Sequence, residues 1–230
     1  MLQALVTGAN RGLGLEMTRQ LLERGDRVVA ACRHPGKALA LTRLAGEHPG
    51  KLHVLPLDLA DSRTIVELSR QIGALDLDIE LLVNNAGVLI EHERFGAIEP
   101  KSLRDSFAVN AEGAFLLAQA LNPHLADGAK VVNLSSTLGS ITSTSSLYSP
   151  SYAMSKAALN MATRLLSIAL AERNIVVVSM SPGWVRTDMG GAGAPLKPEA
   201  SVASMLRVID HLKRPDSGRF LSQNGETIPW

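Results

Sequence analysis

Tyr152 and Lys156 are the two side chains of this sequence best suited, by type and spacing, to acid–base chemistry. In a helix, a separation of four residues places both side chains on one face, one turn apart. A free phenol has a pKa of about 10 and is a poor proton donor or acceptor near neutral pH. A neighbouring ammonium favours the phenolate, so we expect Lys156 to lower the pKa of Tyr152. The spacing alone is more typical of ordinary amphipathic packing, so other motifs must support this interpretation.

A glycine-rich loop follows the first apolar stretch of the chain. Residues 2–6 predict a strand, a helical pattern ends near Gly25, and Gly8, Gly12 and Gly14 stand between them. In this arrangement the glycines let the backbone approach a pyrophosphate, and the helix N-terminus offers free N–H groups. The glycine spacing differs from the usual Gly-x-Gly-x-x-Gly, and many such loops are only tight turns. Its place directly after the first strand favours a dinucleotide site.

The end of the second predicted strand, residues 27–32, indicates which dinucleotide would bind. A site for NAD would have Asp or Glu there to bind the ribose 2′-hydroxyl. This chain has Cys32 and Arg33 instead. Either Arg33 and Arg11 bind a 2′-phosphate, or both are simply solvated. Two arginines and a missing acid together favour NADP. We interpret Cys32 itself as a buried core residue.

Polar side chains also follow three later strands. Asp58 either binds an adenine amino group or caps the next turn. Asn84 and Asn85 stand together at the end of the fourth strand, and Ser135 and Ser136 at the end of the fifth. Buried amides are costly unless they are hydrogen-bonded. We therefore expect a polar crevice where these strands end.

The elements that position these residues alternate along the chain, and Asp61 is a good N-cap for the third helix. Asn110 lies among apolar residues of the fourth helix, where a local backbone partner or a helix kink is the simplest explanation for it. The predicted strands are 2–6, 27–32, 51–57, 79–83, 129–134, 175–180 and 218–221, and after the first helix the predicted helices are 37–45, 62–74, 100–125, 151–173 and 199–212. Such alternation predicts a single α/β domain over residues 1–230, a doubly wound (Rossmann) parallel sheet of about seven strands with helices on both faces. Ligands of such sheets bind beyond the carboxyl ends of the strands.

The composition excludes several other classes of function. The 230 residues carry a net charge of +1 with no basic run, which excludes a nucleic-acid surface or a polybasic membrane anchor. No apolar run is long enough to span a membrane, and no leader pattern precedes the first strand. The single cysteine excludes intrachain disulfides, and the six histidines show no spacing typical of metal ligands. We expect a cytoplasmic protein without a metal.

Together the motifs resemble those of the short-chain dehydrogenase/reductase family, over nearly the whole chain. The residues that carry the resemblance are Thr7–Gly14, Asn84–Gly87, Asn110, Ser136, Tyr152, Lys156 and Pro182–Thr187. The segment 183–191 and the Pro-Trp ending are similar to those of C-factor and sniffer-like carbonyl reductases within that family. The resemblance implies an NADP-dependent oxidoreductase that transfers a hydride between the nicotinamide and a small carbonyl or alcohol substrate.

The resemblance also implies a role for individual residues. Tyr152 would donate the proton to the carbonyl oxygen, Lys156 would lower the pKa of the phenol and hold the nicotinamide ribose, Ser136 would bind the substrate oxygen, and Asn110 would support a water in a proton relay. The residues implied to bind NADP(H) are Gly8, Asn10, Arg11, Gly12, Leu13, Gly14, Arg33, Asp58, Leu59, Asn85, Ala86, Gly87, Tyr152, Lys156, Pro182, Gly183, Val185 and Thr187.

Two departures from the family pattern leave questions open. Ser136 lies sixteen residues before Tyr152, where thirteen is common in the family, so Ser135 stays an alternative. Tyr148 has Tyr152 rather than a lysine four residues later, and is not the catalytic tyrosine.

The segment 188–198, rich in Gly and Pro, predicts a flexible substrate lid. We also expect a homodimer or homotetramer through the helices 100–125 and 151–173. The alternative to an enzyme is a non-catalytic nucleotide-binding sensor or signalling protein on the same fold.

Overall fold

A seven-stranded, wholly parallel sheet forms the centre of the computed structural model, which describes residues 1–230. The strands are β1 (Gln3–Thr7), β2 (Arg27–Cys32), β3 (Leu52–Pro56), β4 (Ile79–Asn84), β5 (Leu125–Leu134), β6 (Val176–Ser181) and β7 (Phe220–Ser222). Their order across the sheet is β3-β2-β1-β4-β5-β6-β7, and every neighbouring pair is parallel. The predicted single-domain, doubly wound fold is confirmed.

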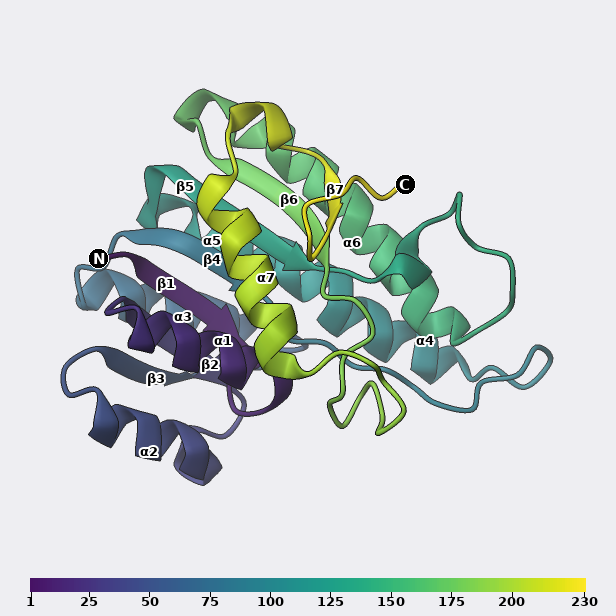
Figure 1. Cartoon of the computed structure of the whole chain (residues 1–230), viewed down its shortest axis with the longest axis horizontal. Coiled ribbons are helices and arrows are strands. Elements are labelled where there is room, and N and C mark those ends of the chain that lie inside the picture. The colour runs from purple at the N-terminus through teal and green to yellow at the C-terminus, as the bar shows by residue number, and fades with distance from the viewer.

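Helices cover both faces of this sheet (Figure 1). One face carries α1 (Gly12–Glu23), α2 (Leu39–Glu47) and α7 (Pro198–His211), and the other carries α3 (Ser62–Ala74), α5 (Gly113–Leu121) and α6 (Pro150–Ala169). The short helix α4 (Pro100–Phe107) packs against α6. No helix of this chain combines the length and the apolar character that a membrane span requires.

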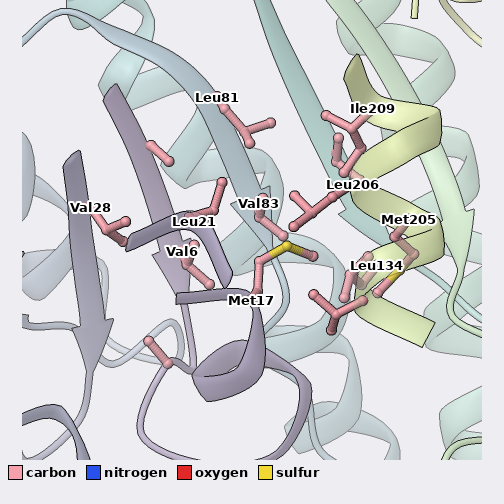
Figure 2. Packing of buried hydrophobic residues seen from close by; sticks show 14 of the residues in the cluster. Val6, Met17, Leu21, Val28, Leu81, Val83, Leu134, Met205, Leu206 and Ile209 are labelled. Atoms are coloured by element: carbon pink, nitrogen blue, oxygen red, sulfur yellow. The ribbon is translucent and has the colours of Figure 1, made fainter. Parts of the chain in front are cut away.

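The first face is packed almost entirely with aliphatic side chains. Figure 2 shows Met17 and Leu21 of α1 lying against Val6 of β1 and Val83 of β4, with Met205, Leu206 and Ile209 of α7 beside them. Alternate residues of the same strands, such as Leu5 and Leu82, point into the core on the other face. Burying each such side chain contributes about 1.5–3 kcal/mol. Because both faces are buried, the strands are apolar throughout, as the sequence predicted.

The predicted long helix over 100–125 is not one continuous α-helix, because it is interrupted once and ends at Leu121. A π-helical turn, Ala108–Glu112, separates α4 from α5, and the N–H of Gly113 bonds to the carbonyl of Ala108. A side chain at Gly113 would meet the Leu59 carbonyl at 2.5 Å, so this turn lies tightly against the neighbouring loop. A 3-10 turn, Asn122–His124, then leads into β5, which begins at Leu125 rather than 129.

Other predicted boundaries agree to within a few residues. The helix over 62–74 is confirmed, and the carboxylate of its N-cap, Asp61, accepts from the Arg63 N–H at 3.0 Å. The helix expected over 37–45 starts at Leu39, after a 3-10 turn. The helix expected over 151–173 ends at Ala169 and is followed by a 3-10 turn over Ala171–Arg173.

The strand order fixes where a ligand would bind. From β1 the chain moves outward to β2 and β3, then returns to pair β4 against the other edge of β1. The loops after β1 and β4 therefore run in opposite directions, which opens a crevice at the carboxyl edge between them. The residues singled out in the sequence follow β1 to β6 at this edge.

Candidate active site

A cavity of about 340 Å³ opens at the carboxyl edge of the sheet. Fifteen of the residues named as site candidates from the sequence line it: Gly8, Asn10, Arg11, Gly12, Leu13, Arg33, Asp58, Leu59, Asn85, Ala86, Gly87, Tyr152, Lys156, Pro182 and Thr187. The other five (Gly14, Asn110, Ser136, Gly183 and Val185) lie beside or beneath this surface rather than on it. Residues from β1, β2, β4, β5 and α6 thus meet in one place, as the parallel topology requires.

The glycine loop lies unusually close to the end of β4. A side chain at Gly8, which has φ +63°, would meet the Cα of Ala86 at 2.9 Å. A side chain at Gly14 would come within 2.4 Å of the Gly8 carbonyl oxygen. The loop therefore folds over itself at the start of α1, and its backbone forms the cavity wall, where a phosphate can reach N–H groups.

Thr7, which we did not select from the sequence, fastens this loop to β4. Its hydroxyl accepts from the N–H groups of Asn85 and Ala86, each at 3.0 Å. In return the Asn85 amide donates to the Thr7 carbonyl at 2.7 Å. The side chain of Asn85 is thus used to join two strand ends. A hydroxyl residue immediately before the first glycine was the available signal.

Three basic or titratable side chains follow β2 along the rim of the cavity: Arg33, His34 and Lys37. Arg33 is exposed and makes no hydrogen bond or ion pair. Lys37 lies in a short 3-10 turn and was missed in the sequence, although it is only four residues beyond Arg33. Arg11 also lines the cavity and forms an exposed ion pair with Asp188 at 2.9 Å.

Asp58 and Cys32 line the same end of the cavity. The Asp58 carboxylate accepts from the N–H of Ala60 at 3.1 Å, which is the contact expected if Asp58 caps the next turn. Cys32 is buried at the end of β2, as predicted, and burial raises the pKa of its thiol. That thiol is therefore protonated at neutral pH and a poor nucleophile.

Tyr152 lies in the first turn of α6 and Lys156 one turn later, so the two side chains share a helix face as expected. The Lys156 ammonium is 5.6 Å from the centre of the Tyr152 ring and is 3% exposed. It donates a hydrogen bond of 2.7 Å to the Leu134 carbonyl at the end of β5. The pair thus lies against the sheet edge instead of pointing to solvent.

The protonation of this pair differs from the expectation. Burial raises the pKa of Tyr152 to about 12, and a hydrogen bond from Ser136 only partly opposes this. Burial also lowers the pKa of Lys156 to about 8. The net shift of the phenol pKa is therefore upward, opposite to the expectation, because desolvation disfavours the charged form of both groups. Tyr152 is a neutral phenol at pH 7, ready to donate its proton.

The two serines after β5 have different surroundings. Ser136 bonds to Tyr152, and its hydroxyl also accepts from the N–H of Leu138 at 3.2 Å. Ser135 lines the cavity, is 3% exposed, and its hydroxyl has no hydrogen-bond partner within the chain. Ser136 is therefore positioned beside the phenol, and Ser135 beside the space that a ligand would fill.

Both simple explanations considered from the sequence apply to Asn110: it lies in the π-helical turn, and its side chain binds the backbone. Its amide accepts from the Val88 N–H and donates to the Val88 carbonyl, both at 2.8 Å. It also donates to Ser155 at 2.9 Å, and the Ser155 hydroxyl donates to the Tyr152 carbonyl at 2.7 Å. Ser155, missed in the sequence, thereby joins Asn110 to the residue that carries the phenol.

A buried polar chain fixes α6 further along. Asn84 donates to Asn133 at 2.8 Å, and Asn133 donates to Thr163 of α6 at the same distance. The Thr163 hydroxyl also lies 2.8 Å from that of Ser179 in β6. Three strands are therefore tied to the helix that carries Tyr152 and Lys156.

The segment 188–198, predicted to be a flexible lid, is folded on itself by internal hydrogen bonds. The Trp184 indole donates to the Gly190 carbonyl at 2.8 Å, and Arg186 donates its N–H to the Leu196 carbonyl at 2.8 Å. Gly183 has φ +78°, and a side chain there would meet Leu196 at 2.7 Å. From this segment Asp188 and Met189 reach the cavity.

A second loop, residues 140–149, is held by the last residues of the chain. The Ser140 hydroxyl donates to the Pro229 carbonyl at 2.7 Å, and the Thr142 N–H donates to the Trp230 carbonyl at 2.8 Å. The Trp230 ring stacks on Phe220 of β7 with centroids 5.7 Å apart. Residues that follow β4, β5 and β6 line the cavity together with Tyr152. No group of three or more His, Cys, Asp or Glu side chains is placed to hold a metal.

Comparisons with known proteins agree with this geometry. The C-signal protein of Myxococcus xanthus is 40% identical over 154 residues, which span 66% of this chain and 93% of that protein. Carbonyl reductase Sniffer of D. melanogaster covers 100% of both chains with a TM-score of 0.94 and 32% identity. The NADPH-bound carbonyl reductase from chicken fatty liver has a TM-score of 0.93 and 36% identity, covering 99% of this chain and 98% of its own. The family model described as short chain dehydrogenase matches residues 3–195. The chain therefore belongs to the short-chain dehydrogenase/reductase family.

Proposed function

We propose that this protein is an NADP-dependent carbonyl reductase, in which Tyr152 supplies the proton. The observation that carries the proposal is that a neutral, half-buried phenol, with Ser136 beside it, and the Lys156 side chain line the same cavity as the glycine loop. Reduction of a carbonyl needs a hydride donor and an acid within reach of the same atom. The similarity to two carbonyl reductases supports the same activity.

NADPH fits the residues present. Gly8 and Gly14 occur where side chains would clash with the loop itself, so the wall stays open to a pyrophosphate. Arg33 has no partner within the chain and Lys37 lies close by, which suits a 2′-phosphate. When bound, NADPH supplies the hydride.

The chain's own residues then bind the oxygen of the substrate and donate a proton to it. Negative charge develops on that oxygen during reduction, and the Tyr152 hydroxyl donates its proton there. When the substrate is bound, the single hydroxyl proton of Ser136 turns from the phenol to the same oxygen and serves as a second donor. The Lys156 ammonium, 5.6 Å from the centre of the ring, favours the phenolate that remains after this transfer. Asn110 keeps the first turn of α6 in place through Ser155.

The substrate is a small carbonyl compound with apolar flanks, and segment 188–198 acts as its lid. Met189 lines the cavity, and Trp184 and Tyr148 are exposed apolar side chains on the segments after β6 and β5. A reducing compartment such as the cytoplasm suits the free thiol of Cys32.

A non-catalytic nucleotide-binding signal remains the second candidate, and the 40% identity to C-signal favours keeping it. The two candidates differ in one measurable property. A binding protein would take up NADPH but would not oxidise it with any member of a panel of aldehydes, ketones and diketones. Turnover with any of these carbonyls supports the reductase.

The Tyr152→Phe variant tests the acid directly. Phe keeps the ring packing but removes the proton donor, so we expect the turnover of carbonyl substrates to fall by about a hundredfold or more. NADPH binding, measured by calorimetry, should stay close to that of the wild type. Tyr148→Phe is the matched control and should retain activity. Full turnover in Tyr152→Phe would contradict the proposed role.

The pH dependence should report Lys156. Tyr152 stays protonated far above neutrality, whereas Lys156 loses its proton near its pKa of about 8. Carbonyl reduction should therefore slow as the pH rises through about 8, because the phenolate that forms loses its stabilising cation. Lys156→Arg should move this decline to higher pH, since a guanidinium stays charged. A rate that stays constant to pH 10 would refute this assignment.

Cofactor preference should depend on Arg33 and Lys37. Replacing both with Ala removes the two cations beside the expected 2′-phosphate, so kcat/KM with NADPH should fall by about tenfold or more. The value with NADH should change little, because NADH lacks that phosphate. Arg63→Ala, an exposed arginine beyond β3, is the control. Equal efficiency of NADH and NADPH in the wild type would overturn the NADP proposal.

The predicted homo-oligomer should form through α6. Met154, Met161, Leu165 and Ile168 are each more than half exposed on this helix, and Phe107 of α4 lies on the same side of the sheet. Such a stripe is typical of a subunit interface. We expect a dimer or tetramer by light scattering, and monomers after Met161→Glu with Leu165→Glu. Val66→Glu on α3, equally exposed, should leave the assembly intact. A monomeric wild type at micromolar concentration would contradict this proposal.

A further inference from the structure

Glu93 reaches the start of the catalytic helix from a different part of the chain. It lies on the segment that leaves the cavity at Val88 and runs to α4, and it is half-buried. One carboxylate oxygen accepts from the Ser151 N–H at 3.0 Å, and the other accepts from the Ser151 hydroxyl. Both oxygens of Glu93 are therefore committed to the residue immediately before Tyr152.

The helix has no cap of its own at this end. Ser149, in the N-cap position, has φ +42° and makes no side-chain capping bond. Pro150 follows and has no N–H, so Ser151 carries the first N–H of α6 that needs a partner. Glu93 supplies it, and its negative charge suits the positive end of the helix dipole.

Two residues next to this link have unfavourable backbones. His92, directly before Glu93, has φ +63°, and Ser149, two residues before Ser151, has φ +42°. Residues with a side chain rarely adopt these angles unless surrounding contacts fix them. The Glu93–Ser151 contact therefore lies between two segments that the fold holds in a defined shape.

The same segment is held at its other end by Asn110, and the two anchors complete a ring. From Val88 the ring passes through Asn110 and Ser155 to the Tyr152 carbonyl, then through Ser151 to Glu93, and back along the chain to Val88. Every step is a hydrogen bond or a short run of backbone. Two members of this ring, Val88 and Tyr152, also line the cavity.

We infer that Glu93 is a positioning residue for Tyr152, which acts by closing this ring and fixing the first turn of α6. The inference rests on the proposed function for its catalytic consequence only. Without Glu93 the first turn can fray, and the phenol loses its fixed position relative to the substrate oxygen. Misplacement of about 1 Å is enough to slow an enzymatic step by up to about a hundredfold.

The test compares Glu93→Ala with Glu91→Ala, an exposed acid on the same segment whose nearest charged partner is His92 at 3.8 Å. In Glu93→Ala we expect kcat/KM for the carbonyl substrate to fall by about tenfold with NADPH affinity preserved, and hydrogen exchange of the Ser151 and Tyr152 amides to rise by about tenfold. Glu91→Ala should match the wild type in both. Glu93→Gln should keep most of the wild-type kcat/KM and amide protection, because its amide oxygen still accepts from the Ser151 N–H.

Several outcomes would overturn the inference. Wild-type exchange at Ser151 and Tyr152 in Glu93→Ala would do so, as would a loss of kcat/KM no greater than in Glu91→Ala. If Glu93→Ala fails to fold, Ser151→Ala removes only the hydroxyl arm and should show the same two effects more weakly; no effect there would count against the ring. A wild type without turnover would refute the proposed function, while the exchange data would still decide the role of Glu93.

Discussion

The contact on which the rest of the site depends is the docking of α6 against the carboxyl end of β5. The Lys156 ammonium donates to the Leu134 carbonyl, and one turn later the Asn160 amide donates to the Gly139 carbonyl at 3.1 Å. Gly139 makes this possible, since a side chain there would meet the backbone of Lys156 at 2.8 Å. The helix therefore sits as close to the strand end as two backbones allow, and the phenol is held at the edge where the cavity opens.

This docking uses polar contacts where an ordinary helix would use apolar ones. A buried ammonium and a row of buried amides are costly unless each finds a partner, and here nearly all do. These contacts define the orientation of α6, because hydrogen bonds fix the rotation and the height of a helix more narrowly than interchangeable aliphatic contacts do. The opposite face of the sheet, against α1 and α7, has no such task, and its core is packed mainly with Leu, Val, Ala and Met. The division between the two faces follows from which of them carries the chemistry.

Much of this arrangement was predictable from the sequence, because it follows from the spacing of apolar residues and from the residues that end each strand or begin each helix. Apolar strands followed by glycines, amides or serines determined the sheet and its functional edge, and Asp61 marked a helix start. The failures have a common physical cause. The break at Ala108–Glu112, the raised pKa of Tyr152 and the roles of Thr7, Ser155 and Glu93 all depend on partners far away in the chain. Local patterns report how a segment folds, but burial and distant partners are set only when the segments meet.

The strand order also places the residues suited to cofactor binding and those near the phenol on different sides of the crevice. Everything suited to holding a dinucleotide's phosphates and adenine follows β1, β2 and β3, on one side of the crevice, while the three loops around the phenol follow β4, β5 and β6 on the other. Those loops are fastened mainly to each other, to α6 and to the last residues of the chain. A lineage could therefore exchange or lengthen them, and so acquire new chemistry for new molecules, while the older half of the sheet kept its cofactor. The same boundary is the natural place to cut when building chimeras.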